Sequence, residues 1–218
     1  MGSQRTSSTL VSDLITKVRY LIHEVLTTAG EDSDAFWKDD EDIIPAIHDG
    51  VQDIATRTGC LEETEEIDLA SNTVEYSITS TTYIAVNAVV YTDANGKKAG
   101  LKRGTPTHIG HEGQEDKPEY WYEFDGKVGV YPMLSARTTE DIKLYMLSLP
   151  AAITATTDTI PTPAHYDVAL KYYVAAMMFL KDRQISRYDG LMSLYYKILD
   201  RYRADFNEQV KESEDVVK

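Results

Sequence analysis

Cysteine is nearly absent from this sequence, since Cys60 is the only one among 218 residues. A single cysteine excludes an intrachain disulfide framework and the usual multi-cysteine zinc sites, and it fits a reducing compartment. No apolar run reaches the roughly 18 residues that a membrane-spanning helix needs, and the amino terminus lacks the apolar core of a signal peptide. We therefore expect a soluble protein with no membrane partner.

The motifs of common catalytic sites are missing as well. The sequence contains no Gly-x-Ser-x-Gly elbow and neither of the two standard glycine-rich phosphate loops. His108, His111 and Glu112 could together hold zinc in a hydrolase, but they fall in a glycine-containing loop without rigid support, which favours a solvated loop. Cys60 follows a helix end and has no sequence cue for an activating base. We predict that the protein is not an enzyme and binds neither cofactor nor metal.

Basic residues are scarce too. The 22 lysines and arginines face 36 acidic residues, so the formal net charge is −14, which disfavours general nucleic-acid binding. The exception is a basic patch that we expect on a single hairpin, made of Lys97, Lys98, Lys102 and Arg103. It could contact DNA or an acidic partner, or it could consist of solvated lysines that block unwanted strand pairing.

Helical periodicity is present near the amino terminus. Apolar residues recur every three or four positions after Ser12, a good N-cap, and this first helix should end at Gly30. A second helix should run from Asp42 to Gly59. Between them, residues 31–42 hold seven acids around Phe36 and Trp37. We expect the two aromatic residues to close the bottom of a bundle, and the alternative is a docking surface for a basic partner.

Two more helices are predicted near the carboxyl terminus. Thr162 is a plausible N-cap for the third, with Pro163 in its first turn. Residues 168–180 are apolar on nearly every face, which is typical of a helix enclosed by other elements. The fourth helix carries one apolar stripe, formed by Tyr188, Met192, Tyr195, Leu199, Tyr202 and Phe206. Residues 207–218 are charged and are either a frayed helix end or an arm that orders on a partner.

The middle of the chain changes to a two-residue period. About six short strands are expected between Glu65 and Leu149, with turns at residues 93–96 and 125–126. The predicted fold class is therefore α+β, a four-helix bundle of two N-terminal and two C-terminal helices with an inserted small antiparallel β-barrel or sandwich. We place the boundaries at 1–62, 63–150, 151–206 and 207–218. We assign no function to the loop from Thr105 to Pro118.

Aromatic residues are the best candidates for interfaces, because tyrosine and tryptophan supply large amphipathic contact areas. Fifteen tyrosines are present, and those of the predicted helices are divided between the interior and subunit contacts. The interface candidates are Phe36, Trp37, Tyr172, Tyr173, Tyr195, Tyr196 and Tyr202. An alternative function is a carbohydrate- or surface-binding β-domain on a helical stalk, with Tyr120, Trp121 and Tyr122 as its stacking platform.

The order and spacing of several short segments resemble a known family, the head-to-tail adaptor or connector proteins of tailed bacteriophages. The similarity covers residues 36–206. Its marks are Trp37 with Asp40 and Ile43, residues 57–59 (RTG), 74–78 (VEYSI), 117–121 (KPEYW), 130–132 (VYP), 147–150 (LSLP), 160–161 (IP), 166–170 (YDVAL) and 181–182 (KD).

The resemblance implies a structural virion protein at the head-to-tail junction, or neck, assembled in the host cytoplasm. Such proteins form a homo-oligomeric ring, typically of twelve copies, beneath the portal protein, and they present a surface to the next tail or neck protein. DNA passes through the lumen without sequence-specific binding. The resemblance also implies that a helical bundle makes the ring while the β insertion faces outward or toward the tail.

Overall fold

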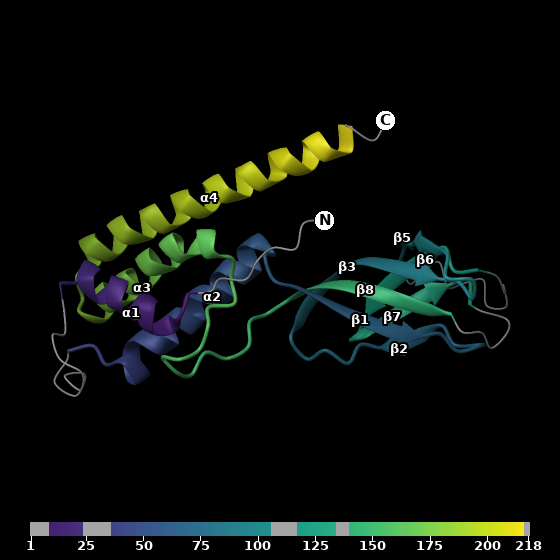
Figure 1. Cartoon of the computed structure of the whole chain (residues 1–218), viewed down its shortest axis with the longest axis horizontal. Coiled ribbons are helices and arrows are strands. Elements are labelled where there is room, and N and C mark those ends of the chain that lie inside the picture. Colours follow the sequence, from purple (N-terminus) through teal and green to yellow (C-terminus); the bar gives the residue numbers. More distant parts are fainter. Residues whose placement is uncertain (1–8, 24–35, 106–116, 134–139, 216–218) are drawn as a thin grey trace. The chain divides into compact units, whose positions relative to one another are not determined.

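The computed structural model describes residues 9–23, 36–105, 117–133 and 140–215, with side chains described as far as Tyr202. The chain divides into two compact units (Figure 1). The helical unit combines Met1–Leu61 with Pro150–Lys218, and the β unit is Glu62–Leu149. The fold is thus α+β, with the sheets inserted between two helical halves, which confirms the predicted fold class.

The helical unit is built around its third helix. Helix α3 contacts α1, α2 and α4, and seven of its residues between Ala169 and Phe179 are buried. The elements are α1 (Val11–Leu21), a π-helical turn (Asp39–Ile43), α2 (Ile44–Thr58), a 3-10 turn (Ala164–Tyr166), α3 (Asp167–Lys181) and α4 (Ile185–Asp215). The prediction of a central helix at residues 168–180 is confirmed, although Val168 and Leu180 remain 45% and 40% exposed, so this helix is not enclosed on every face.

Helix α1 begins without the side-chain cap that we expected from Ser12. Its first N–H groups donate instead to backbone carbonyls of a distant loop, Val11 to Asp158 at 2.9 Å and Ser12 to Thr156 at 3.0 Å. A tertiary backbone contact therefore satisfies the donors that a cap would satisfy. The helix ends at Leu21, well before Gly30, and residues 24–30 lie outside the described part of the chain.

Helix α2 ends as predicted. Gly59 adopts a left-handed conformation with φ of 63°, and its N–H donates to the Ala55 carbonyl at 2.8 Å. Within the helix, Gly50 allows α3 to approach closely, because a Cβ atom there would lie 2.6 Å from Leu170 and 2.7 Å from Tyr173. A small residue at this position thus sets the spacing of α2 and α3.

The predicted cap of α3 is wrong. A 3-10 turn precedes the helix, and Thr162 is fully buried with an Oγ1 atom that has no hydrogen-bond partner among the described residues. The negative charge near the helix start is present as expected, since Asp167 occupies the first turn. Its Oδ2 atom also accepts a hydrogen bond of 2.6 Å from Thr9, which fixes the N-terminal segment to α3.

Helix α4 buries the predicted stripe. Met192, Tyr195 and Leu199 are buried, Tyr188 and Tyr202 are half-buried against the same core, and the side chain of Phe206 lies outside the described set. The helix then continues to Asp215, which agrees with the helical one of the two alternatives predicted for residues 207–218. Its 31 residues span roughly 46 Å, whereas the 15 residues of α3 span roughly 22 Å. The second half of α4 therefore extends past α3 (Figure 1).

The β unit contains eight strands among its described residues, two more than predicted. They are β1 (Glu62–Asp68), β2 (Glu75–Ser77), β3 (Tyr83–Thr92), β4 (Lys98–Gly100), β5 (Lys102–Arg103), β6 (Tyr120–Phe124), β7 (Lys127–Tyr131) and β8 (Asp141–Ser148). They form two four-stranded sheets of order β1-β8-β3-β4 and β2-β7-β6-β5. The predicted hairpin turn at Asp125-Gly126 is confirmed between β6 and β7.

The two sheets share one apolar core. Val89, Tyr91 and Ile142 from the first sheet and Trp121 and Val130 from the second belong to a single buried cluster. Of the two predicted architectures, the structure is thus a sandwich and not a closed barrel. The chain crosses between the sheets at Leu101, where β4 ends and β5 begins.

Candidate functional site

The four predicted basic residues do not lie on one hairpin. Lys97 and Lys98 belong to the β3–β4 hairpin of the first sheet, whereas Lys102 and Arg103 form β5, which pairs in parallel with β6 of the second sheet. The Lys102 N–H donates to the Glu119 carbonyl at 2.9 Å, and this bond draws the chain into the second sheet. The basic residues therefore follow the strand that crosses from one sheet to the other.

Three cationic side chains at this crossover lie over aromatic rings. Lys102 lies 5.9 Å from the ring centre of Tyr120, Arg103 5.2 Å from that of Trp121, and Lys117 5.0 Å from that of Tyr91. Such contacts fix the direction of long side chains. Lys117 also pairs with Asp93 at 3.7 Å. Sequence reasoning did not include Lys117 in the patch, because it is distant in sequence and only the fold brings it close.

A groove of about 510 Å³ runs beside this crossover. It is lined by Ala99, Gly100, Leu101, Lys102, Lys117, Pro118 and Glu119. Its wall is open at Gly100, where an added Cβ atom would meet nothing within 4 Å. Its lining carries Lys102, the carboxylate of Glu119, and Lys117, which is paired with Asp93. Because an exposed strand also lines it, the groove suits an extended segment.

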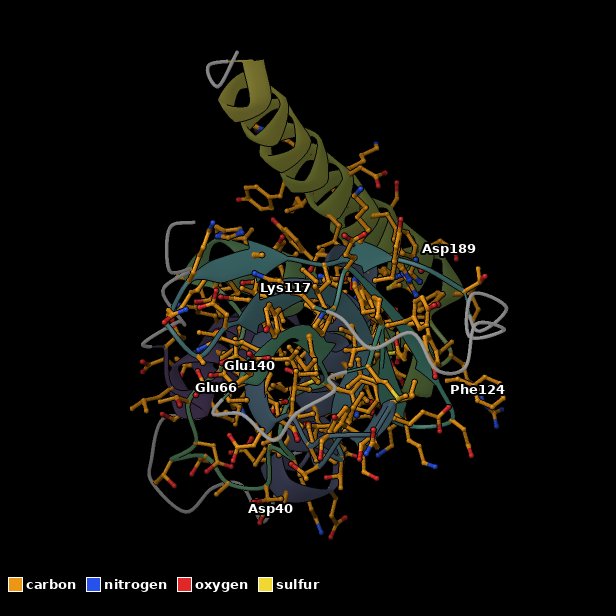
Figure 2. The ribbon with its side chains drawn as sticks, turned by 90° about the vertical axis from the view of Figure 1, so that its right-hand side faces the viewer. Asp40, Glu66, Lys117, Phe124, Glu140 and Asp189 are labelled. Atoms are coloured by element: carbon orange, nitrogen blue, oxygen red, sulfur yellow. The ribbon has the colours of Figure 1, made fainter. Side chains whose placement is uncertain are left out.

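The proposed carbohydrate platform is not on the surface. Trp121 and Tyr122 are only 2% and 4% exposed, and the Tyr122 hydroxyl donates to Glu75 at 3.1 Å. Burial, together with this hydrogen bond, raises the pKa of Tyr122 to about 12. The exposed aromatic residue of this hairpin is instead Phe124, at the periphery of the β unit (Figure 2). The aromatic run therefore builds the sandwich core and does not form a stacking surface.

The tyrosines of the helical unit divide between interior and surface. Tyr195 is fully buried, and its hydroxyl donates to Asp53 at 2.5 Å, so this interface candidate is a packing residue. Burial and the nearby Asp53 carboxylate raise the pKa of Tyr195 far above its usual range. Tyr172 and Tyr173 are half-buried against the helical core. Tyr196 is 40% exposed, with the Arg57 guanidinium 5.2 Å from its ring centre.

The remaining aromatic candidates, Tyr202, Trp37 and Phe36, differ in their burial and in the rings that they contact. Tyr202 lies edge-on to both His165 and Tyr166, at ring distances of 5.1 Å and 5.7 Å. Trp37 is buried in the helical core as expected, whereas Phe36 is 64% exposed and packs edge-on against it at 4.7 Å. Tyr196 and Phe36 thus offer the largest exposed aromatic area of the predicted set.

The described part of the acidic run before α2 is largely paired within the helical unit. Asp39 accepts from Arg19 at 2.7 Å, Asp42 pairs with Lys181, and Glu41 lies 3.4 Å from Lys38. Asp40 lies at the periphery (Figure 2). Three of the four described carboxylates of the run thus have internal partners, which favours a structural role for this part of it. Glu31, Asp32 and Asp34 lie outside the described residues, so the docking surface for a basic partner stays a prediction.

Within the described part of the chain, the residues considered for catalysis give no site. His108, His111 and Glu112 lie outside the described residues, and no three potential metal ligands gather within the described ranges. Cys60 is buried, and burial raises the pKa of its thiol, which lowers the fraction of reactive thiolate. In the part of the chain that the structure describes, no helix is long and apolar enough to cross a membrane.

Comparison with known proteins identifies the family. The model of the SU10 adaptor protein family matches residues 9–216, nearly the whole chain. The chain belongs to the SU10 adaptor protein family. This membership confirms the predicted resemblance to head-to-tail adaptors and, with it, a structural adaptor role for the protein.

Two further comparisons concern curated proteins and solved structures. No curated protein matches this adaptor. Among solved structures, it is similar to a chain in the neck of an empty GTA particle computed with C6 symmetry. The two chains share 14% sequence identity over 78% of the adaptor and 80% of the other chain, with a TM-score of 0.29.

Proposed function

We propose that this adaptor forms a ring of twelve copies beneath the portal of a tailed bacteriophage and joins the portal to the next tail or neck protein. The ring surrounds the channel through which DNA passes, without sequence-specific contacts, and it assembles in the host cytoplasm. The observation that carries the proposal is the match to the SU10 adaptor protein family over residues 9–216, because an adaptor is a protein that joins two parts of an assembly.

The charge of the chain supports a channel that DNA does not adhere to. Each copy carries a formal charge of −14, so twelve copies would bring about 170 negative charges around the DNA. A phosphate backbone is repelled by such a surface and slides past it. The few basic side chains of the β unit are concentrated at the β4–β5 crossover, and we assign them to a protein contact in preference to DNA.

Exposed apolar residues of the helical unit support its role in ring and portal contacts. Tyr20, Phe36 and Ile185 are 76%, 64% and 52% exposed. Large exposed apolar side chains of this kind commonly become buried in protein interfaces. The part of α4 beyond α3 is a second candidate, because a helix that extends from its own bundle can reach a neighbouring subunit or the portal.

The proposal is tested with capsids that contain the portal and lack tails. Purified adaptor is added to these capsids and to matched capsids assembled without portal, and bound copies per particle are counted by quantitative mass spectrometry. We expect about twelve copies on each portal-containing particle and none above background on the others. Equal binding to both kinds of capsid, or binding to neither by a folded protein, would overturn the proposed function.

A further inference from the structure

The two outer strands of one sheet carry opposite charge. In the sheet β1-β8-β3-β4, strands β1 and β4 are the edges. Strand β1 reads EETEEID and thus has five acids in seven residues. Strand β4 begins with Lys98, and Lys97, Lys102 and Arg103 flank it. One sheet therefore has an acidic edge and a basic edge.

Part of this charge is engaged within the β unit and part is exposed. Glu65 accepts from Thr79, Glu63 accepts from Ser80, and Glu66 pairs with Lys143 at 2.8 Å. The exposed acids of β1 that make no ion pair with another described residue are Glu62 and Asp68. At the opposite edge, Lys98 of β4 is exposed, and so is Lys102, which begins β5 just after the crossover; neither makes an ion pair within the described ranges. Each edge thus keeps charge that a partner can reach.

Strand direction makes the two edges compatible with each other. The pairs β1–β8, β8–β3 and β3–β4 are all antiparallel, so β1 and β4 run in opposite directions. A second copy in the same orientation, placed beside the first, would therefore lay its β1 antiparallel to this β4. A rotation about an axis parallel to the strands preserves their direction, and the same match then recurs around a ring.

The charges also disfavour pairing between like edges of two copies. Two β1 edges would repel each other, and so would two β4 edges, which disfavours a two-fold symmetric dimer through this sheet. Unlike edges attract, and contacts between unlike surfaces generate rings or filaments. Edge strands often carry charge that prevents indiscriminate pairing. Because the two edges here have opposite signs, only the pairing of a β1 edge with a β4 edge is favoured.

We infer that β4 of one copy pairs with β1 of the next, so that the sheets of neighbouring β units join into a belt around the ring. This inference rests on the proposed ring and adds the contact that orders its subunits. The groove is lined by Ala99 and Gly100 of β4, and the space at the Cβ position of Gly100 is free within 4 Å, which leaves room for an incoming strand. Because β4 has only three residues, the ladder is short, and the contact selects the orientation of the neighbour more than it supplies affinity.

Charge reversal in the full-length protein tests the inference. The acidic edge is reversed by Glu62→Lys with Asp68→Lys, and the basic edge by Lys98→Glu with Lys102→Glu. Each pair should weaken cooperative binding to portal-containing capsids by roughly tenfold, since two exposed ion pairs per contact are lost. The combination of all four substitutions recreates the pairs with exchanged signs and keeps the wild-type net charge. It should restore binding to within about twofold of the wild type.

Two controls separate the contact from general charge effects. Lys17→Glu with Lys197→Glu changes the net charge by the same amount as the basic-edge variant, but both residues are exposed on the helical unit. Combined with the acidic-edge reversal, it keeps the wild-type net charge without recreating the edge pairs, so it should not restore binding. Thermal unfolding of every variant should match the wild type, because the four edge residues are exposed. If the combined variant binds no better than the weaker of the two reversed pairs, the edges do not meet and the inference is wrong.

A second measurement is independent of the capsid. Wild-type protein, mixed from isotopically light and heavy batches at high concentration, is treated with a carbodiimide, which links carboxylates to lysines in direct contact. We expect mixed-isotope links between Lys98 or Lys102 and Glu62 or Asp68. Intermolecular links at other sites only would contradict the edge contact, whereas a failure of wild-type protein to bind portal would contradict the proposed function instead.

Discussion

Arg19 of α1 donates through Nη2 to the carboxylate of Asp39 at 2.7 Å and to the carbonyl of Trp37 at 2.9 Å. The arginine is only 4% exposed, although it is a charged residue in the last turn of an amphipathic helix. This contact fixes the segment before α2 to α1. It also neutralises one carboxylate of an acidic run whose negative charges repel one another.

Replacing Arg19 by methionine should lower the free energy of unfolding of the helical unit by about 2–3 kcal/mol. The substitution leaves the Trp37 carbonyl and the partly exposed Asp39 carboxylate without this donor, and removing one member of a buried pair is costly. Arg19→Lys keeps the charge but loses the planar fork, so a smaller loss of about 1 kcal/mol is expected. Urea unfolding can be followed through Trp37, after Trp121→Phe removes the only other tryptophan. Equal stability of Arg19→Met and wild type would contradict the contact.

Tyr195→Phe should destabilise the helical unit by about 1–2 kcal/mol. The change removes the hydroxyl that joins α4 to Asp53 of α2, while the Asp53 carboxylate keeps its 2.7 Å pair with Arg57. Hydrogen bonds to charged groups contribute about 1.5–3 kcal/mol, and the remaining partner reduces the loss. Tyr196→Phe is the matched control, because this neighbouring ring is exposed and should lose almost no stability. A ranking in the opposite order in urea unfolding would refute the assignment.

Gly129→Ala should destabilise the β unit by about 1–3 kcal/mol or more. A Cβ atom at Gly129 would lie 2.0 Å from the ring of Tyr122, which is itself held by Glu75, so strands β6 and β7 must separate. Gly100→Ala provides the comparison, since its Cβ atom would enter open space. Trp121 fluorescence in a Trp37→Phe background reports this unit alone. The prediction fails if both alanine variants unfold at the same urea concentration.

Alkaline stability should depend on Tyr122. The pKa of Tyr122 is raised to about 12 by burial and by the Glu75 hydrogen bond, whereas in the unfolded chain tyrosine titrates near about 10. The stability that its neutral form supplies is complete below pH of about 10 and is lost as the pH rises toward about 12. In Tyr122→Phe, the unfolding free energy should fall with pH less steeply in this window, by up to about 1.4 kcal/mol per pH unit. An unchanged slope would contradict the burial of this hydroxyl.

Periodicity and local turn chemistry predicted most of the architecture. The stripe of α4, the left-handed Gly59 and the Asp125-Gly126 hairpin depend on neighbouring residues only, and all three are confirmed. The prediction from Ser12 failed because a distant loop satisfies the first donors of α1, and the prediction from Thr162 failed because a 3-10 turn precedes α3. Strands β4 and β5 have three and two residues, which is too short for a two-residue period to be recognised.

The candidate surfaces were predicted less well than the fold. Sequence reasoning found the four basic residues but placed them on one hairpin, because nothing local signals that the chain crosses between sheets at Leu101. It treated Trp121 and Tyr122 as a surface platform, although an aromatic run beside a hairpin turn is equally compatible with a core strand. The acidic edge of β1 was visible as glutamate pairs, but its meaning depends on the sheet order, which only the structure supplies.

The most direct test of the account is a cryo-electron microscopy reconstruction of the portal vertex after adaptor has been added to portal-containing capsids without tails. We predict a ring of additional density below the portal, with twelve copies into which the helical unit and the β unit fit, and with continuous density between neighbouring β units. A portal vertex without added density, from a folded adaptor in excess, would contradict the central claim.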